Sequence, residues 1–584
     1  MLNRATPPCS WSLVLQGVFP VLCLAVTPAD GHAQDPHDEV FAETDYPSAS
    51  QCAACHQQIY SEWSSSSHAY ASISPMFHKF EQRINDLSAG TIGYFCMRCH
   101  ASVGTTLGES RDMPLTERAQ VSREGVTCVS CHRVDQQYGR VNGERRIEPG
   151  PIYDPVYGST GADTLAAVIA SSDRFRVQTS AAETGPGVPI HREAIRFEQL
   201  SESEFCVSCH QVAVHPGIKL EVVWDQYRAS PAADAGISCQ DCHMGQTPGQ
   251  PDGYATAPSA VLAGVPINPT RKHTNHTFYG PGYASAHPGV FPHNPAAERW
   301  TIDEWLRFDF RAGWGTDAFE DRLAGGQVQV NFPEMWAEPD DRYEARDIVQ
   351  QNLAKLEEKR ELRRQVMENG SKLDGPFFSG DPRRGGALKF HYTLTNTNSG
   401  HNLPSGSLGA QPELWLNVAL IDPDGQRIWE SGYLDSNGDM ADLHSLDVLA
   451  GRIPHDDQLF NLQTKFLTQN VKGTDREMYL PINLDVDQLP FIRPAGQPVS
   501  VLNHPPGVRM ESRSLPPLSS RDATYTVPGD LLTRPGTYRL AVRLRSRAEP
   551  IYFMKFVGAT EEMERAMNEW MLDIHPYTVE FEVR

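Results

Sequence analysis

The chain has 584 residues, enough for two or three domains with hydrophobic cores of their own. It contains 51 Lys and Arg against 73 Asp and Glu, which gives a formal net charge of −22 at pH 7. This acidic balance argues against binding to nucleic acid or to an anionic membrane surface, and it suits partners that have a basic docking face.

The amino terminus has the features of a secretory signal peptide. Arg4 is followed by an apolar stretch from Trp11 to Val26 and by a polar run that closes on Gly31-His32-Ala33. This small-x-small pattern predicts cleavage after Ala33, so residues 1–33 are assigned to the signal peptide and the mature protein to the periplasm. The apolar stretch is too short and interrupted for a membrane anchor, and no later stretch is long and apolar enough to span a bilayer.

Five copies of Cys-x-x-Cys-His follow, and they use every cysteine after the signal peptide. We name them motifs 1 to 5 in chain order: Cys52-Ala-Ala-Cys55-His56, Cys96-Met-Arg-Cys99-His100, Cys128-Val-Ser-Cys131-His132, Cys206-Val-Ser-Cys209-His210 and Cys239-Gln-Asp-Cys242-His243. Each is typical of an attachment site for c-type haem. Two thiols three positions apart can bond the two vinyl groups of one porphyrin, and the next residue supplies the proximal axial imidazole. Zinc knuckles or disulfides would explain the cysteine pairs, but not a histidine after each one.

The motifs therefore predict five covalently bound haem c groups. The predicted attachment residues are Cys52, Cys55, Cys96, Cys99, Cys128, Cys131, Cys206, Cys209, Cys239 and Cys242, and the predicted proximal iron ligands are His56, His100, His132, His210 and His243. Residues 34–300 form the predicted pentahaem domain, mostly α-helical and irregular, because Gly, Pro and Ser are frequent and long periodic segments are few. Motifs 2–3 and 4–5 have nearly the same spacing, which indicates an internal duplication of a two-haem unit.

The composition changes after residue 300. Residues 301–384 are predicted to be a helical linker, in which Arg342–Asn369 contains neither Pro nor Gly and stops at Gly370. A further short helix is expected at Glu298–Phe310. Residues 385–584 are predicted to form an all-β, sandwich-like domain, because hydrophobic residues alternate with polar ones. The alternating stretches are Leu388–Leu394, Leu414–Leu420, Tyr538–Leu544 and Tyr577–Val583, with a turn at Pro423-Asp424-Gly425.

One loop of the carboxy-terminal region has a composition that calcium sites share. Asp435-Ser-Asn437-Gly438-Asp439 has the right residue types, but its glycine falls at the wrong place for an EF-hand. A plain turn is favoured over a calcium site.

Two segments resemble c-552/c-554-type multihaem cytochromes. They are Gln51-Cys-Ala-Ala-Cys-His56 continuing to Trp63-x-x-Ser66-x-His68-Ala69, and Trp224-x-x-Tyr227-x-x-Ser230 running into motif 5. The resemblance covers the haem region, under half of the chain. It implies a periplasmic electron carrier with closely stacked haems, most of them ligated by two histidines, and it implies that His68 is a distal ligand. Five motifs and a long β region depart from the compact tetrahaem members, so the family's redox partner is not carried over.

Five distal ligands are needed if every haem is six-coordinate. Of 21 histidines, five lie in the motifs and His32 lies in the signal peptide, which leaves fifteen candidates. The predicted distal ligands are His68, His276, His401, His215 and His273, with His273 as the rival of His276; weaker candidates are His78, His191, His287 and His293, and Met76 and Met244 as thioether ligands.

His401 is predicted from the loop that contains it. Asn396 to Gly406 follows a predicted strand and holds two Gly, one Pro and three Asn, so it is an irregular loop. Gly400 permits close approach to another surface. The pattern Asn-x-x-Gly-His-x-x-Pro-x-Gly also looks like a loop that follows the haem region in large multihaem cytochromes. A surface turn that happens to contain a histidine is the alternative.

The predicted function is electron transfer between redox proteins, either other cytochromes or a membrane quinol-linked complex, without catalysis of its own. Two alternatives stay open. A multihaem oxidoreductase acting on a small nitrogen or sulfur compound would need one haem with an open face, often marked by an altered motif, yet all five motifs end in His. A structural role would use the β domain for assembly of a complex.

The first prediction concerns the number of haems. The intact mass of the purified mature protein should exceed that of the polypeptide by five haem groups, because five motifs use all ten cysteines. Four haems or fewer, with a free thiol pair, would contradict the assignment.

Overall fold

The computed structural model describes residues 45–87, 93–137, 145–161, 163–214, 218–290, 293–405, 412–463 and 513–584, together with Gly90, 141–143 and short strands at 465–468, 478–479 and 508–511. All of these lie in the compact unit Phe41–Arg584. The predicted signal peptide and its cleavage site lie outside the described residues. No helix among the described residues has the length and apolar character that a membrane crossing requires.

The haem region is built from short helices, as its composition predicts. Motifs 2 to 5 each end on one helical turn whose last residue is the motif histidine; these turns are α5 (Met97–His100), α8 (Cys128–His132), α11 (Val207–His210) and α14 (Cys239–His243). In motif 1, helix α2 (Ala49–Ala53) ends within the motif, and His56 is the N-cap residue of the next helix. Helix α14 begins with a capping box in which Ser238 and Asp241 satisfy each other's backbone N–H groups. The remaining helices of this region are α3 (Gln57–Ser64), α4 (Pro75–Leu87), α6 (Ser102–Thr106), α7 (Gln120–Arg123), α9 (Asp163–Ile169), α10 (Ser172–Phe175), α12 (Val223–Arg228) and α13 (Pro231–Asp234).

Small two-stranded sheets join these helices. The pairs are β1 (Val156–Gly158) with β4 (Ala194–Arg196), β2 (Val177–Gln178) with β3 (Val188–Pro189), β5 (Val212–Val214) with β6 (Ile218–Glu221), β7 (Ala255–Ala257) with β10 (Arg271–His273), and β8 (Val261–Leu262) with β9 (Val265–Pro266). Short pairs of this kind fix loops in place without forming a core of their own.

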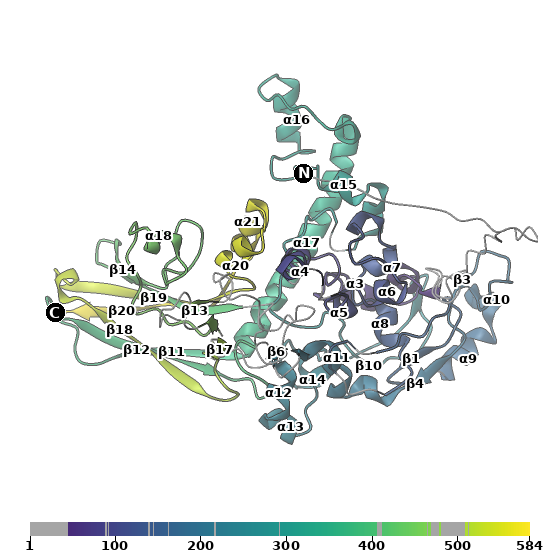
Figure 1. The fold of residues 1–584 in the computed structure, drawn as a ribbon, viewed down its shortest axis with the longest axis horizontal. Helices are drawn as coiled ribbons and strands as arrows, with labels where there is room; N and C mark the ends of the chain where they lie inside the picture. The colour runs from purple at the N-terminus through teal and green to yellow at the C-terminus, as the bar shows by residue number, and fades with distance from the viewer. Residues whose placement is uncertain are drawn as a thin grey trace, which may run out of the picture. The chain divides into compact units, whose positions relative to one another are not determined.

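One long helix, α17 (Pro339–Asn369), connects the two halves of the chain (Figure 1). It begins three residues before the predicted start, with Pro in its first turn, and ends before Gly370 as predicted. Its buried side chains belong to three clusters in turn: Val349 packs with Trp305 and Trp336, Leu356 with Trp63 and Tyr70, and Met367 with the β core. The helices that precede it are α15 (Ile302–Trp305) and α16 (Asp317–Ala324).

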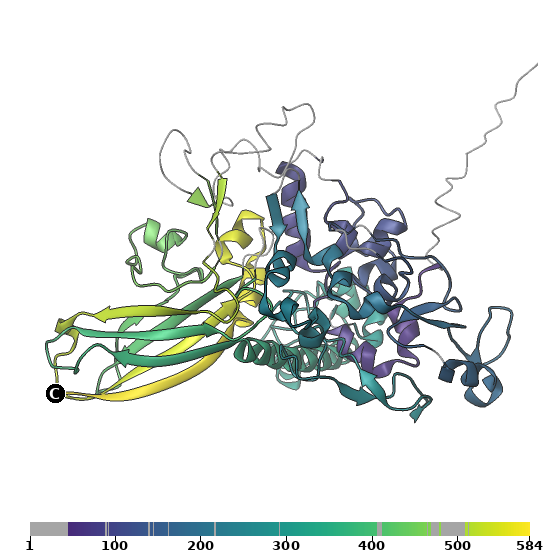
Figure 2. The ribbon, with the colours of Figure 1, turned by 90° about the horizontal axis from the view of Figure 1, so that it is seen from below.

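The carboxy-terminal region contains two larger sheets whose strands lie side by side (Figure 2). One has the order β11-β12-β18, from Ser371–Phe378, Leu388–Asn396 and Ser520–Val527; the other has the order β14-β13-β19-β20, from Arg427–Ser431, Glu413–Ile421, Gly536–Arg547 and Leu572–Val583. Alternate residues of both sheets, such as Phe390 and Leu416, are buried in a single hydrophobic core. A third sheet consists of β15 (Lys465–Thr468), β16 (Met478–Tyr479) and β17 (Val508–Glu511).

Three predictions about elements need correction. The linker is not wholly helical, since Ser371–Phe378 forms strand β11 against β12. The region after residue 385 is not all β, since it contains α18 (Leu446–Leu449), α20 (Ile551–Phe556) and α21 (Glu561–Glu569). The helix expected at Glu298–Phe310 is divided into a 3₁₀ turn, Pro295–Arg299, and α15, because Thr301 is extended and caps α15. The predicted domain boundaries at 300 and 384 stay predictions.

A buried group of charges lies where β13 meets β19. Glu413 and Arg547 face each other in the register of the two strands and form an ion pair, and each is only 1% exposed. Asp439 is 2% exposed and accepts a hydrogen bond from the backbone N–H of Tyr552 at 2.9 Å. Burial and the nearby charge of Glu413 raise the pKa of Asp439 to about 7. This carboxyl is therefore protonated in the folded protein at mildly acidic pH.

The second prediction concerns the pH dependence of stability. The folded state holds a proton on Asp439 that an unfolded carboxyl, with a pKa of roughly 3.9, releases, so the free energy of unfolding should fall as pH rises from about 4 to about 7. Asp439→Asn stays neutral, and its side-chain oxygen can still accept from Tyr552. The free energy of unfolding of the variant should therefore fall less over this range. The difference from the wild type should be a few kcal/mol, since one pKa unit corresponds to about 1.4 kcal/mol.

Urea unfolding followed by far-ultraviolet circular dichroism at pH 5 and pH 8 measures this difference. Asp457→Asn is the matched control, since the Asp457 side chain is 90% exposed. Equal pH slopes for wild type and Asp439→Asn would contradict the prediction.

Candidate functional site

The ten motif cysteines form no disulfide with one another. Burial raises the pKa of Cys55 and Cys131, and it raises that of Cys96 to about 12. Buried thiols of raised pKa are poor metal ligands, because a metal ion binds the thiolate. These three cysteines therefore fit a role as covalent attachment points better than a role as ligands.

Three of the motif histidines, His56, His132 and His243, are held by backbone carbonyl groups. Nδ1 of His56 lies 2.6 Å from the carbonyl oxygen of Ser259, and the same contact links His132 to Tyr157, at 2.6 Å, and His243 to Tyr279, at 2.5 Å. Burial lowers the pKa of each of these imidazoles, so each stays neutral. A neutral ring that donates from Nδ1 presents the lone pair of Nε2, which is the form that binds a metal ion.

Four of the five motif histidines face a second histidine ring. The pairs, with ring-centroid distances and interplanar angles, are His56 with His191 (6.4 Å, 7°), His132 with His276 (6.3 Å, 29°), His210 with His68 (6.1 Å, 51°) and His243 with His401 (6.1 Å, 13°). Each partner ring belongs to a loop that is far in sequence from the motif that it faces. Chain topology, and not local spacing, brings them together.

These distances fit two imidazoles on one iron. An imidazole nitrogen binds a first-row metal ion at roughly 2 Å, and the nitrogen of a five-membered ring with sides of roughly 1.33 Å lies roughly 1.1 Å from the ring centre. Opposed axial imidazoles therefore have centroids roughly 6.3 Å apart. All four pairs lie within 0.2 Å of this value.

The partner histidines are also neutral. Burial is the largest cause of a pKa lowered to about 3 for His68 and to about 4 for His191, His276 and His401. Nδ1 of His276 and of His401 contacts a backbone carbonyl oxygen, at 2.7 and 2.9 Å. Nδ1 of His68 is buried without a hydrogen-bond partner, whereas a backbone hydrogen bond at Glu193 raises the pKa of His191 against the larger effect of burial.

Several candidate ligands have other partners. Nε2 of His273 contacts a carboxylate oxygen of Glu62 at 2.7 Å, which leaves His276 as the histidine that faces a motif. His287 uses both ring nitrogens, with Nε2 3.0 Å from the carbonyl oxygen of Phe308 and Nδ1 accepting from the N–H of Gly289. His293 stacks on Trp63, and Met76 packs with Phe553. His215 lies outside the described residues.

Motif 2 differs from the others. His100 stacks on Phe77 with ring centroids 4.1 Å apart and an interplanar angle of 8°. His78 lies against the edge of Phe77, and its Nε2 contacts the carbonyl oxygen of Ser72 at 2.6 Å. In the part of the chain that the structure describes, His100 has no histidine ring at the spacing of the other four pairs.

The motifs contact one another through their cysteines. Thiol hydrogen bonding raises the pKa of Cys128 next to Cys52, of Cys99 next to Cys209, and of Cys206 next to Cys239. These contacts join motif 1 to 3, motif 2 to 4, and motif 4 to 5. The guanidinium of Arg145 links motifs 3 and 4, since it donates to the carbonyl of Ser130 at 2.9 Å and to Sγ of Cys209 at 2.9 Å. All five motifs thus form one connected group.

The His401 loop docks on the helices that precede motif 5. Its backbone N–H at Asn402 donates to the side chain of Gln226 in α12 at 3.2 Å, and the N–H of Ala232 in α13 donates to the carbonyl of Ser399 at 3.1 Å. Within the loop, the Asn396 amide donates to the carbonyl of His401 at 3.1 Å. The loop is therefore fixed at both ends, with the His401 ring on the motif 5 side.

The Asp435–Asp439 loop is a turn closed by its own donors. One carboxylate oxygen of Asp435 accepts from the backbone N–H of Asn437 and Asp439, and the other accepts from the hydroxyl of Ser445. Among the described residues, no group of three or more His, Cys, Asp or Glu is arranged to hold a metal ion.

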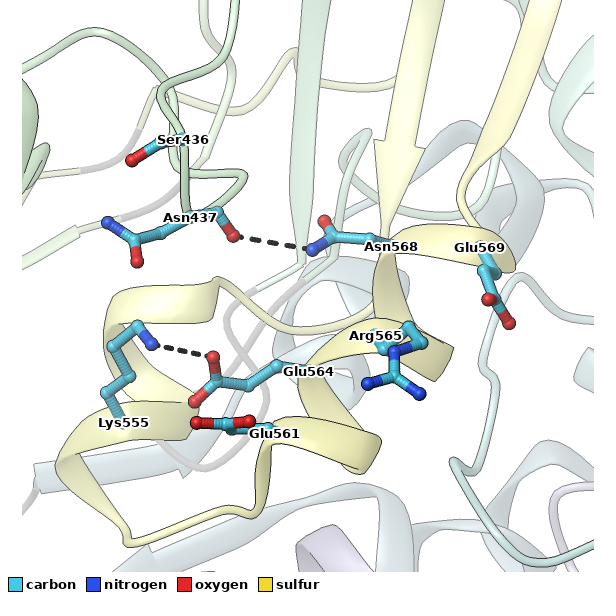
Figure 3. A pocket seen from close by; sticks show the side chains of 8 residues that line it. All are labelled: Ser436, Asn437, Lys555, Glu561, Glu564, Arg565, Asn568 and Glu569. Carbon is cyan, nitrogen blue, oxygen red and sulfur yellow. Dashed lines mark hydrogen bonds and ion pairs between the residues drawn. The ribbon is translucent and has the colours of Figure 1, made fainter. Parts of the chain in front are cut away.

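A pocket of about 530 Å³ lies between this loop and helix α21 (Figure 3). Its lining charges are partly paired, as in the contact of Lys555 with Glu564 at 2.6 Å. None of the motif histidines lines it.

Part of the haem region matches a known protein family. Residues 51–133, which contain motifs 1 to 3, match the family model described as cytochrome c554 and c-prime. The match confirms the predicted resemblance to c-552/c-554-type multihaem cytochromes. No curated protein sequence matches the chain. Among solved structures, the chain is similar to a penta-heme cytochrome c552 from Thermochromatium tepidum, with 92% of this chain and 99% of that chain aligned, 14% sequence identity and a TM-score of 0.48.

Proposed function

We propose that the protein is a periplasmic pentahaem c-type cytochrome that transfers electrons between redox partners. The observation that carries the proposal is the spacing of 6.1–6.4 Å between four motif histidines and four further histidines. On this assignment His191, His276, His68 and His401 are the distal ligands of the haems on motifs 1, 3, 4 and 5. Haem iron with two neutral imidazoles supplies reversible one-electron chemistry and has no open coordination position.

The residues around the motifs support this use. Backbone carbonyls orient the imidazoles, and burial keeps them neutral and limits access of water. Contacts between cysteines of different motifs bring the attachment edges together, which favours fast electron exchange because tunnelling falls steeply with distance. Redox proteins, either other cytochromes or a membrane quinol-linked complex, are the proposed partners.

The β region contributes to the haem region in this proposal. We infer that its two larger sheets pack face to face as a sandwich, because their alternate residues share one core. That core holds the end of β12 from which the His401 loop extends. The β region thereby shields the haem of motif 5.

Motif 2 supports a second candidate function. His100 stacks on Phe77, and within the described residues no histidine faces it as a distal ligand. An open iron at motif 2 would permit reduction or oxidation of a small nitrogen or sulfur compound. His215, the remaining predicted distal ligand, would instead close this position.

The third prediction tests the function. The oxidised protein should show at least four low-spin haems with two histidine ligands in its EPR and near-infrared magnetic circular dichroism spectra, and full reduction should take up five electrons. Fewer than four such haems would contradict electron transfer through histidine-paired haems. A high-spin signal from one haem that is perturbed by nitrite or sulfite would favour the oxidoreductase.

The fourth prediction tests the His401 assignment. His401→Ala should leave five haems attached but convert one from low spin to a high-spin form that binds cyanide or carbon monoxide, because one axial imidazole is lost. His455→Ala is the matched control, since it removes an exposed histidine of the β region that contacts Asp457. An unchanged His401→Ala spectrum would rule out the assignment.

A further inference from the structure

Two buried cationic side chains lie one turn apart on helix α17. Lys359 is 7% exposed and Arg363 is 2% exposed, and positions four apart share one helix face. Neither forms an ion pair with any carboxylate of the described residues. The neighbouring acid Glu357 pairs with Arg360 near the surface. A buried charge without a counter-charge is costly, so we expect an anion close to this pair of side chains.

The polar contacts of the pair do not neutralise it. The Lys359 ammonium donates to the hydroxyl of Ser67 at 3.4 Å and lies 5.3 Å from the ring centre of Tyr70. The Arg363 guanidinium donates to the backbone carbonyls of Pro281, at 2.9 Å, and Trp570, at 3.3 Å. Hydroxyl and carbonyl groups satisfy hydrogen bonds but carry no net negative charge. Burial, followed by the charge of Arg363, lowers the pKa of Lys359 to about 7, as expected for a lysine without an acid partner.

The residues that contact Lys359 and Arg363 also lie next to one proposed haem site. Ser67 directly precedes His68, the histidine that faces motif 4. Phe278 packs on the His68 ring with centroids 4.2 Å apart, and the chain then continues to Pro281, which binds Arg363. Both segments that enclose His68 therefore also contact the two cations.

We propose that Lys359 and Arg363 bind the propionate carboxylates of the haem that motif 4 carries opposite His68. Each haem brings two carboxylates and no other charged substituent, so an attached haem provides the anion that this part of the chain lacks. The proposal rests on the proposed attachment of haem to motif 4. A soluble oxyanion shares the same chemistry and is the alternative source of the negative charge.

The experiment is a redox titration of the full mature protein that carries its haems. Lys359→Met and Arg363→Met remove one positive charge each, and Lys359→Arg and Arg363→Lys keep it. Lys389→Met, at an exposed position of β12, is the control for a change in net charge alone. Intact mass first establishes that each variant carries five haems. The titration is done in a chloride buffer without oxyanions, and again with added phosphate or sulfate.

The expected result is a lower potential for a single haem in both methionine variants. Loss of the cation leaves carboxylates uncompensated beside the iron, which disfavours the added electron. We expect the reduction equilibrium of this haem to shift at least tenfold, which is 59 mV for one electron. The affected haem should be the one whose low-spin signal disappears in His68→Ala. Lys359→Arg, Arg363→Lys and Lys389→Met should leave the potentials unchanged.

Two results would overturn the proposal. One is an unchanged potential for every haem in both methionine variants that carry five haems. The other is a wild-type potential that changes with phosphate or sulfate and loses this response in Lys359→Met, which would assign the site to a soluble oxyanion. Fewer than five haems in the wild type would instead contradict the proposed function itself, so the two failures are distinguishable.

Discussion

The separation of about 6 Å between opposed imidazole rings is the constraint on which the haem region depends. Several other features of that region help to hold the paired rings at this distance and keep them neutral. Backbone carbonyls fix Nδ1 of several rings, short helices end on the histidines of motifs 2 to 5, and small two-stranded sheets hold the loops between them. On the proposed function, a region built in this way needs few long helices, because attached haems would supply much of its apolar interior.

Local sequence was sufficient for the attachment residues and for most of the larger elements. A motif of five residues encodes its own chemistry, and the two-residue period of Leu388–Leu394 requires a strand with one buried face. Strand β11 was missed because its glycine and proline interrupt any period. Helices α20 and α21 were missed because they are short insertions between strands β19 and β20, where their apolar residues pack with Met76.

The distal ligands could be predicted from the sequence only in part. His68 and His401 were found because each has unusual neighbours, and His276 was found with a rival three residues away. The contact of His273 with Glu62 and the spacing of the His276 ring from the His132 ring separate those two. His191 had no distinguishing neighbour in the sequence, and its position opposite His56 results from the path of strands β1 to β4. A ligand from a distant loop is defined by topology, which a local pattern cannot encode.

The loop of His401 also bears on how the protein matures. Motif 5 is synthesised long before His401, which belongs to a loop between strands of the β region. If His401 is the sixth ligand, the last coordination bond of that haem forms only after strand β12 has paired and the Asn396 amide has closed the loop. Completion of this haem would then report that the carboxy-terminal half has folded. Truncated or misfolded chains would keep a reactive, five-coordinate iron, and that iron would distinguish them chemically from finished molecules.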